Sequence, residues 1–203
     1  MNTERVRSIL IGMILFVTTI LPASAAINEL WIKTYDGGSQ DDFANGVATD
    51  AFSNVIVTGK SYVGGNWDYH TIKYDKDGNI LWNKTFDRGY DDVALDVATD
   101  KSGNVIVTGY SDEGGATIPR TKDDYYTIKY DRDGNILWNR TFDGGTWATA
   151  AGVATDEFGN VIVTGSFTDN KTFNIQTIKY DENGIVHSRP VDRTAVRDDD
   201  PEF

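Results

Sequence analysis

The stretch Val97-Ala-Thr-Asp-Lys-Ser-Gly-Asn-Val-Ile-Val-Thr-Gly109 decides how this chain folds, because the chain carries it in three versions. One near-copy, VATDAFSNVIVTG, runs from Val47 to Gly59, and another, VATDEFGNVIVTG, runs from Val153 to Gly165. Self-similarity at a period of about 50 residues is typical of an array of repeated structural units. The quoted stretch therefore predicts a repeat fold built from it and its surroundings.

Each copy lies in a unit with four strand-like segments. The quoted stretch supplies two of them, and a Thr-Ile-Lys-Tyr segment (71–74, 127–130, 177–180) supplies a third. A Trp-containing segment (29–36, 80–87, 136–143) alternates apolar and polar residues, as a half-buried strand does. No segment carries a helical period long enough for a helix. Four-stranded antiparallel units joined by hairpin-length connections are typical of β-propeller blades.

The turns within these units contain residues that favour tight turns. Gly103 and Gly159 precede Asn in the turn of the quoted stretch, and glycine supplies a positive φ at little cost. Ser53 takes this place in the first copy, so we expect that turn to be strained or differently shaped. The sequences DKDGN at 75–79 and DRDGN at 131–135 resemble half of a calcium loop but lack its distal glutamate, which favours plain hairpin turns.

The recurring Asp-Asp pair, Val-Ala-Thr-Asp, Gly-Asn-Val-Ile-Val-Thr-Gly and Tyr-Asp-x-Asp-Gly-Asn together cover most of residues 29–189. This pattern resembles the bacterial and archaeal β-propeller repeat family that is often described as seven-bladed, with blades similar to NHL repeats. The resemblance implies an all-β fold in which the Val-Ala-Thr-Asp strand is innermost and the Trp strand outermost. It also implies an exported or surface-associated protein, and it implies no defined activity.

The repeat count limits the architecture. We expect blades at about 45–87, 93–143 and 149–189, with an extra outer strand at 29–36. A closed propeller typically needs about four or more blades, so this chain is expected to form a partial one. Three outcomes stay open: an open arc, a ring completed by oligomerisation in which the strand at 29–36 serves a neighbouring copy, or a fragment of a longer gene.

Both ends of the chain differ from the repeats. Arg5 and Arg7 precede an apolar run at 9–21 and an A-x-A pattern that ends at Ala25. This order predicts a signal peptide over residues 1–25, with an uncleaved anchor as the alternative, and hence a secreted or cell-surface protein. Residues 190–203 are charged and unpatterned, which predicts a disordered acidic tail.

Composition excludes several classes of function. The formal net charge of −12 disfavours binding to nucleic acid and to anionic membranes. The absence of cysteine excludes disulfides and thiolate metal sites, and His70 and His187 are too few for a histidine-rich metal site or a histidine-based triad. No phosphate-binding glycine motif occurs. We therefore predict no catalytic residue, no metal site and no cofactor, with calcium as the alternative.

The loops where the three copies differ carry the candidate site. In a propeller the loops before the inner strand and after the second strand emerge on one face, and here they are rich in carboxylates and aromatics. Such a face suits a sugar, a cation or a basic protein segment, whereas the alternative is that the Asp side chains only cap turns. The candidate ligand-binding residues are Asp41, Asp42, Trp67, Asp68, Asp91, Asp92 and Trp147.

Three Asn-x-Thr sequons, at Asn83, Asn139 and Asn170, are candidate glycosylation sites in a host that has the machinery. The sequence as a whole favours an exported, non-catalytic binding or surface-interaction module for a protein or carbohydrate ligand at the cell surface. Two alternatives stay open. One is a propeller-type glycoside hydrolase or lyase that uses the carboxylates of the loop face, and the other is a truncated, inactive paralogue.

Overall fold

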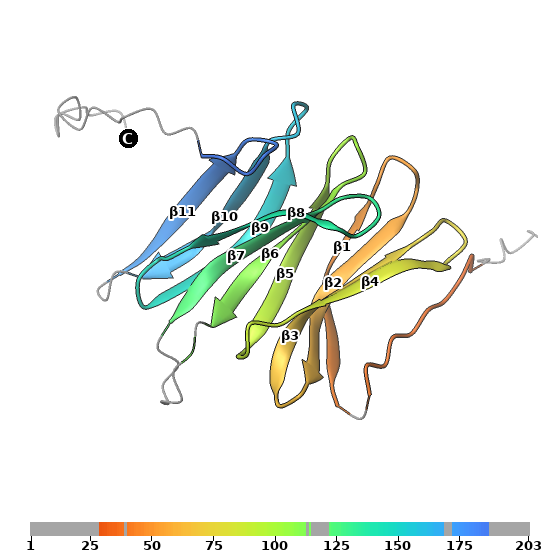
Figure 1. The fold of residues 1–203 in the computed structure, drawn as a ribbon, viewed down its shortest axis with the longest axis horizontal. Helices are drawn as coiled ribbons and strands as arrows, with labels where there is room; N and C mark the ends of the chain where they lie inside the picture. Colours follow the sequence, from red (N-terminus) through yellow and green to blue (C-terminus); the bar gives the residue numbers. More distant parts are fainter. Residues whose placement is uncertain (1–28, 39, 113, 115–121, 169–171, 187–203) are drawn as a thin grey trace, which may run out of the picture. The chain divides into compact units, whose positions relative to one another are not determined.

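The computed structural model describes residues 29–38, 40–112, 114, 122–168 and 172–186, and all regular structure among them is β (Figure 1). The chain divides into two compact units, Met1–Leu30 and Trp31–Phe203, and every described strand lies in the second. No helix among the described residues is long and apolar enough to span a membrane. The strands are β1 (Asp42–Thr49), β2 (Val55–Val63), β3 (Asn66–Tyr74), β4 (Ile80–Phe86), β5 (Asp92–Thr99), β6 (Val105–Asp112), β7 (Asp123–Tyr130), β8 (Ile136–Phe142), β9 (Trp147–Thr155), β10 (Val161–Thr168) and β11 (Phe173–Tyr180).

The strands group into repeats that we call repeat 1 (β1–β4), repeat 2 (β5–β8) and repeat 3 (β9–β11). Within each repeat, consecutive strands pair antiparallel in chain order, so the expected four-stranded antiparallel sheets are confirmed for repeats 1 and 2. A single parallel bridge between Asp123 and Trp147 connects β7 to β9. The end of the third predicted blade, from residue 187 to 189, lies outside the described residues, as do the predicted signal peptide and acidic tail.

The quoted stretch forms the hairpin β5–β6, and its glycine has a structural reason. The inner strand β5 bulges between Ala94 and Asp96, opposite Gly109 and Thr108 in the middle of β6. A Cβ on Gly109 would lie 2.0 Å from the carbonyl oxygen of Val93, a distance that no side chain tolerates. Gly59 and Gly165 meet the same close approach in their own repeats. The bulge of the inner strand thus explains why all three copies have glycine after Val-Thr.

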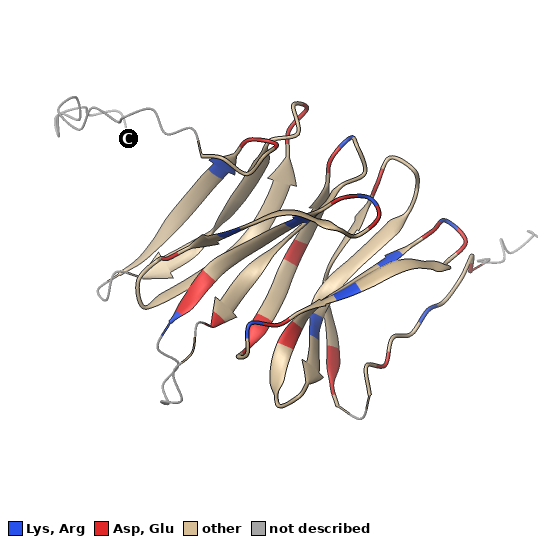
Figure 2. Cartoon of the chain, in the orientation of Figure 1, with Lys and Arg blue, Asp and Glu red and all other residues tan. Residues whose placement is uncertain are grey.

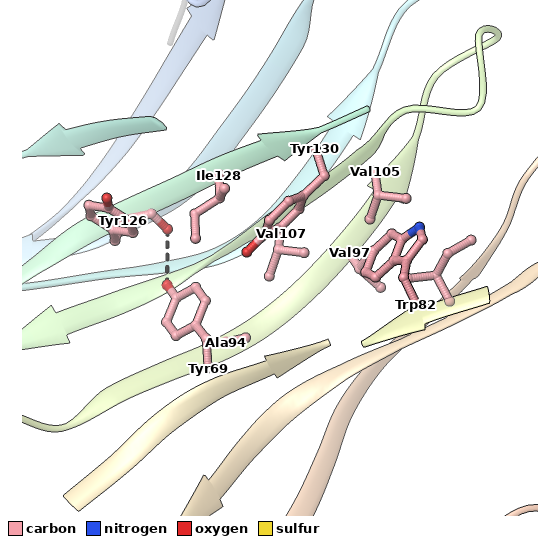
Figure 3. Packing of buried hydrophobic residues seen from close by; sticks show 10 residues of the cluster. Tyr69, Trp82, Ala94, Val97, Val105, Val107, Tyr126, Ile128 and Tyr130 are labelled. Carbon is pink, nitrogen blue, oxygen red and sulfur yellow. Dashed lines mark hydrogen bonds between the residues drawn. The ribbon is translucent and has the colours of Figure 1, made fainter. Parts of the chain in front are cut away.

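The apolar core lies between repeats. At the first junction, between repeats 1 and 2, Tyr69 and Trp82 pack against Val97, Val107 and Tyr130 (Figure 3). At the second junction, between repeats 2 and 3, the residues in the same register form a second cluster: Ile106, Tyr125 and Trp138 against Ala148, Ala150, Val161, Val163, Ile178 and Tyr180. Because each sheet packs on a neighbour, the second strand is apolar on both faces, as the sequence predicts.

Hydrogen bonds across the junctions repeat as well. Tyr69 donates its hydroxyl to the carbonyl oxygen of Tyr126 at 3.0 Å, which Figure 3 draws as a dashed line. The indole Nε1 of Trp82 donates to the carbonyl oxygen of Arg132 at 3.0 Å, and Trp138 makes the same bond to Glu182 at 3.0 Å. Each outer Trp therefore reaches over the turn after the third strand of the following repeat, 131–135 for Trp82 and 181–184 for Trp138, and links one sheet to the next.

The predicted outer strand at 29–36 is wrong as a strand. No described residue from 29 to 38 belongs to a sheet, and no described strand precedes this segment to pair with it. Its side chains nevertheless keep the repeat register. Trp31 donates Nε1 to the carbonyl oxygen of Lys76 at 3.2 Å and its ring lies 5.7 Å from that of Tyr74, as Trp82 does against Arg132 and Tyr130.

Candidate functional site

Acidic residues lie at the end of repeats 1 and 2 where inner strands begin and outer strands end, and further acidic residues lie in the turns at the opposite end (Figure 2). Asp68 is the third residue of β3, Asp87 follows β4, and Asp92 begins β5 of the next repeat. Antiparallel pairing brings the start of β3 and the end of β4 to the same end of the sheet. Packing of repeat 2 on repeat 1 adds the start of β5.

Asp68, Asp87 and Asp92 form an acidic cluster at the first junction. One carboxylate oxygen of each lies within 4.8 Å of the others. Asp68 and Asp92 are only 2% and 0% exposed, whereas Asp87 faces solvent. The cluster thus consists of two buried carboxylates and a third, that of Asp87, which is exposed to solvent.

Hydrogen bonds satisfy this cluster only in part. The backbone nitrogen of Arg88 donates to Asp92 Oδ2 at 2.6 Å, but Asp92 Oδ1 is buried without a hydrogen-bond partner. Asn66 Nδ2 donates to Asp68 Oδ1 at 2.8 Å and to Asp87 Oδ1 at 3.4 Å. A neutral amide therefore bridges two of the three carboxylates, and one buried oxygen of the third has no donor.

The electrostatic environment opposes full ionisation. Burial, followed by the charges of Asp87, Asp92 and Asp91, raises the pKa of Asp68 to about 7. Burial also raises the pKa of Asp92, although hydrogen bonds and the charge of Arg88 counteract it. Among the described residues, no lysine or arginine lies within ion-pair distance of Asp68, Asp87 or Asp92. Negative charge in the cluster is therefore incompletely balanced by this chain.

The second junction offers a direct comparison. Asp124 and Asp143 stand in the register of Asp68 and Asp87, and Ala148 stands in the register of Asp92. Lys122 takes the position of Asn66, and its ammonium group lies 3.3 Å from Asp143 Oδ2 and 3.7 Å from Asp124 Oδ2. A lysine thus occupies the space between two carboxylates that a neutral amide occupies at the first junction.

Trp67 and Asp91 lie beside the acidic cluster but already have partners. The Trp67 ring contacts Tyr62 edge-on at 5.1 Å between centroids, and Lys60 Nζ lies 4.1 Å from a Trp67 ring centroid. The backbone nitrogen of Trp67 donates to Asp91 Oδ1 at 3.0 Å. Asp91 therefore acts here as a capping carboxylate, and one face of Trp67 is covered by a lysine.

The other candidate residues lie elsewhere. Asp42 occupies the register of Asp92 one repeat earlier and accepts a bond from the Gly37 nitrogen at 2.8 Å. Asp41 beside it is exposed. Trp147 lies at the second junction and packs edge-on against Phe173 at 5.3 Å. Of the predicted residues, the structure brings Trp67, Asp68, Asp91 and Asp92 to one place and leaves Asp41, Asp42 and Trp147 apart from it.

Asp87 and Asn66 also lie at this site but are not among the predicted site residues. Asp87 follows each outer strand at a repeated position, shared with Asp36 and Asp143, and that repetition was the available signal. Asn66 has its counterpart in Lys122, but the loops before them differ in length, which hides the equivalence in the sequence. Their contacts depend on how the repeats pack.

The carboxylates at the opposite end of the repeats are engaged by their own turns. Asp75 Oδ1 accepts bonds from the nitrogens of Asp77 and Asn79 at 2.9 and 2.8 Å, and Asp131 repeats this geometry. These are the expected hairpin turns. The sequons at Asn83 and Asn139 lie exposed on β4 and β8, and Asn170 lies outside the described residues.

A hollow of about 330 Å³ lies on the outward face of repeat 1, by which we mean the face that points away from repeat 2. The residues lining it include Trp31, Tyr35, Phe43, His70, Ile72 and Tyr74. Ile72 and Tyr74 stand in the register of Ile128 and Tyr130, which pack against the preceding repeat at the first junction. The hollow is therefore the surface where a preceding repeat would pack, filled in part by residues 31–35.

Comparison with known proteins adds little to this geometry. No protein-family model matches the chain, so the resemblance to NHL-like blades is not supported, and no curated protein matches it either. Among solved structures the chain is similar to a GH43_12 protein retrieved from capybara gut metagenome, with a TM-score of 0.42 and 11% identity over 73% of this chain and 31% of that one. The chain thus spans about a third of that structure's length. So distant a likeness carries no argument about function, and what stands is an all-β chain of antiparallel sheets with an acidic cluster between two of them.

Proposed function

We propose that this chain is an exported, non-catalytic β-propeller repeat protein that binds a positively charged partner through the acidic end of repeats 1 and 2. The observation that supports this most is the acidic cluster, whose three carboxylates have no lysine or arginine paired with them among the described residues. The net charge of −12 would draw basic partners toward this end over a long range.

A binding role fits the burial of the cluster better than catalysis does. Hydrolysis of a glycoside requires two carboxyl groups that flank the scissile bond and both reach the substrate. Asp68 and Asp92 are 2% and 0% exposed, so a sugar ring would meet Asp87 alone. Stacking of a sugar on Trp67 is also hindered, because Lys60 covers its ring. These features favour a basic protein segment at the cell surface over a carbohydrate.

Calorimetric titration of the exported chain tests the proposal. The probes are a lysine- and arginine-rich peptide and a panel of neutral oligosaccharides. We expect the peptide to bind, with an affinity that falls as ionic strength rises. Asp87→Asn should weaken binding, whereas Asp133→Asn, an exposed carboxylate in a turn at the opposite end, should not. The proposal fails if the peptide does not bind or if both variants bind equally.

We also propose a second copy of this chain as a partner for repeat 3. Ile175 and Phe173 of β11 are 82% and 72% exposed, whereas Tyr125 and Tyr69, in the register of Ile175, are 1% exposed under the following repeat. The face of repeat 1 that points away from repeat 2 is the matching surface. Its residues are equivalent to those with which repeat 2 packs on repeat 1 and repeat 3 packs on repeat 2. Head-to-tail packing of this kind would continue the interfaces that the chain already contains.

Light scattering coupled to size-exclusion chromatography measures this association. We expect a mass that rises with concentration and that returns to the monomer in Ile175→Asp. Leu81→Asp is the matched control, because Leu81 is 51% exposed but lies on the outer strand β4 of repeat 1. Phe158, in contrast, stands in the register of Phe52, which packs on the following repeat at Gly103. A monomer at all concentrations, or equal behaviour of both variants, would argue against self-association.

A further inference from the structure

We infer that the acidic cluster is a divalent-cation site whose natural occupant is Ca²⁺, with Asp68, Asp87 and Asp92 as ligands. The inference rests on the proposed function in that it uses the same carboxylates, and an ion there would offset part of the charge that we propose to attract a basic partner. The peptide titration is therefore run on the chelator-treated chain and repeated with Ca²⁺. The inference is more specific than the proposed function, because it places one ion at the first junction and none at the second.

The spacing of the oxygens suits this ion. Ca²⁺ binds oxygen at about 2.3–2.6 Å, so two oxygens on opposite sides of the ion lie about 4.6–5.2 Å apart. The three carboxylate oxygens lie within 4.8 Å of one another, which lets all three contact one ion together. Mg²⁺ binds at about 2.0–2.1 Å, demands octahedral geometry and keeps several waters, which the two buried carboxylates do not favour.

Asp92, the most deeply buried member of the cluster, also favours a positive group here. Its side chain is 0% exposed, the Arg88 nitrogen and the Ser111 hydroxyl are its hydrogen-bonding neighbours, and Oδ1 has no donor in hydrogen-bonding geometry. A buried carboxylate oxygen without a donor is costly, and native structures leave few such atoms. An ion held jointly with Asp68 and Asp87 would supply the missing interaction, and the exposed Asp87 gives the ion a route from solvent.

The second junction shows what this position requires when no ion is available. There Lys122 lies within 3.7 Å of both Asp124 and Asp143, and Ala148 removes the third carboxylate. At the first junction, a neutral Asn66 amide contacts two of the three carboxylates, so the charge that Lys122 carries has no counterpart on residue 66.

Arg88, the positive charge beside the cluster, offsets its negative charge only in part. Arg88 lies next to the cluster, but its guanidinium group stacks over the Tyr126 ring at 5.2 Å and its NH1 lies 3.5 Å from Ser111 Oγ. Asp91 adds a further negative charge beside Asp68. A cation at the cluster would therefore be attracted by four carboxylates and repelled by one guanidinium.

Calorimetry and thermal unfolding of the chelator-treated exported chain, with CaCl₂ and separately MgCl₂ as probes, test the site. We expect one Ca²⁺ per chain, tighter binding of Ca²⁺ than of Mg²⁺, and a midpoint temperature that rises with Ca²⁺ concentration. Asp87→Asn should lower Ca²⁺ affinity more than about 10-fold, the lower limit for groups that only support a metal ligand. Asp143→Asn, its counterpart at the second junction, should leave the affinity unchanged.

Asn66→Lys is the sharper variant, because it copies the second junction into the first. We expect it to abolish Ca²⁺ binding and to raise the midpoint temperature of the ion-free protein. The inference is overturned if Ca²⁺ does not bind, or if it binds equally to wild type, Asp87→Asn and Asn66→Lys. Should Asn66→Lys not fold, the exposed Asp87→Asn decides alone. Peptide binding without Ca²⁺ binding would refute the ion and leave the proposed function standing.

Discussion

Lys179 Nζ lies 2.7 Å from Asp156 Oδ2 in repeat 3, and the lysine side chain is 58% exposed. The same pair in repeat 2, Lys129 and Asp100, is 3.0 Å apart and only 3% and 5% exposed. The difference has a plain cause, since the turn of the following repeat covers Lys129, whose Nζ also lies 3.5 Å from the Glu182 carbonyl oxygen. One sequence motif thus forms a buried ion pair in one repeat and a surface pair in the next.

Removing the lysine should therefore have unequal effects. Breaking a buried ion pair by deleting one partner costs about 3–5 kcal/mol, because the other charge stays buried. Exposed pairs contribute about 0–1 kcal/mol. We expect Lys129→Ala to lower the free energy of unfolding by the larger amount and Lys179→Ala by the smaller, measured by urea denaturation. Equal losses would contradict the assignment of burial.

Acid should destabilise the protein through the buried pairs. Burial tends to raise the pKa of Asp100, but hydrogen bonds from Asn104 and Lys129 outweigh it and hold the pKa below its ordinary 3.8. The pKa of Asp50 beside Lys73 is lowered in the same way. Because the folded-state pKa is the lower one, this stabilisation is present above about pH 4 and is lost as the pH falls further.

Asp100→Asn isolates that contribution. The variant should be less stable than wild type at pH 7, and its unfolding free energy should fall less steeply between pH 5 and pH 3. Denaturation curves at several pH values give the slope. An unchanged slope would show that other carboxylates govern acid unfolding.

Ser53 provides a stabilising change. Its φ is 62°, the left-handed region, where Gly103 and Gly159 stand at 78° and 80° in the other copies. A residue with a side chain pays roughly 1–2 kcal/mol for this conformation. We expect Ser53→Gly to raise the free energy of unfolding by about 1 kcal/mol. Gly159→Ser, where a Cβ would meet little but Glu182 at 3.9 Å, should cost a similar amount.

The segment before β1 gives a fourth test. Trp82, 8% exposed, lies in the sheet of repeat 1, and Trp82→Ala should cost about 3–5 kcal/mol, as truncation of a buried tryptophan does. Trp31 makes the same contacts from a segment without strand pairing, so Trp31→Ala should cost less. Chemical denaturation of both variants decides. Equal costs would mean that residues 31–36 are held as firmly as β4.

Much of the fold follows from local sequence. The period, the alternation within strands and the Asp-Gly turns identify sheet order, because consecutive strands joined by short turns must pair antiparallel. Ser53 was recognisable as a strained residue from its two glycine counterparts. The strand at 29–36 failed because its pattern matches β4, whereas strand formation also needs a partner edge that the described chain does not provide.

The candidate site was predictable only in outline. Asp68 and Asp92 were recognisable as acidic loop residues, but their approach depends on packing between two repeats. Asp91 and Asp92 look identical in sequence and each accepts a bond from a backbone nitrogen, but Asp92 belongs to the three-carboxylate cluster and Asp91 does not. Neighbouring residues on an extended strand point to opposite sides, so one of the pair joins the cluster and the other does not.

The sequence by itself determined the all-β repeat, the order of strands and the positions that require glycine, because these depend on contacts within one hairpin. The tertiary structure alone decided which carboxylates meet, which lysines are buried and that Asn66 and Lys122 hold the same place. Those relationships arise where one repeat packs on the next. The residues that meet at a junction come from two different repeats and are far apart in the sequence. No local sequence pattern links them, so the same motif has a different environment at each junction.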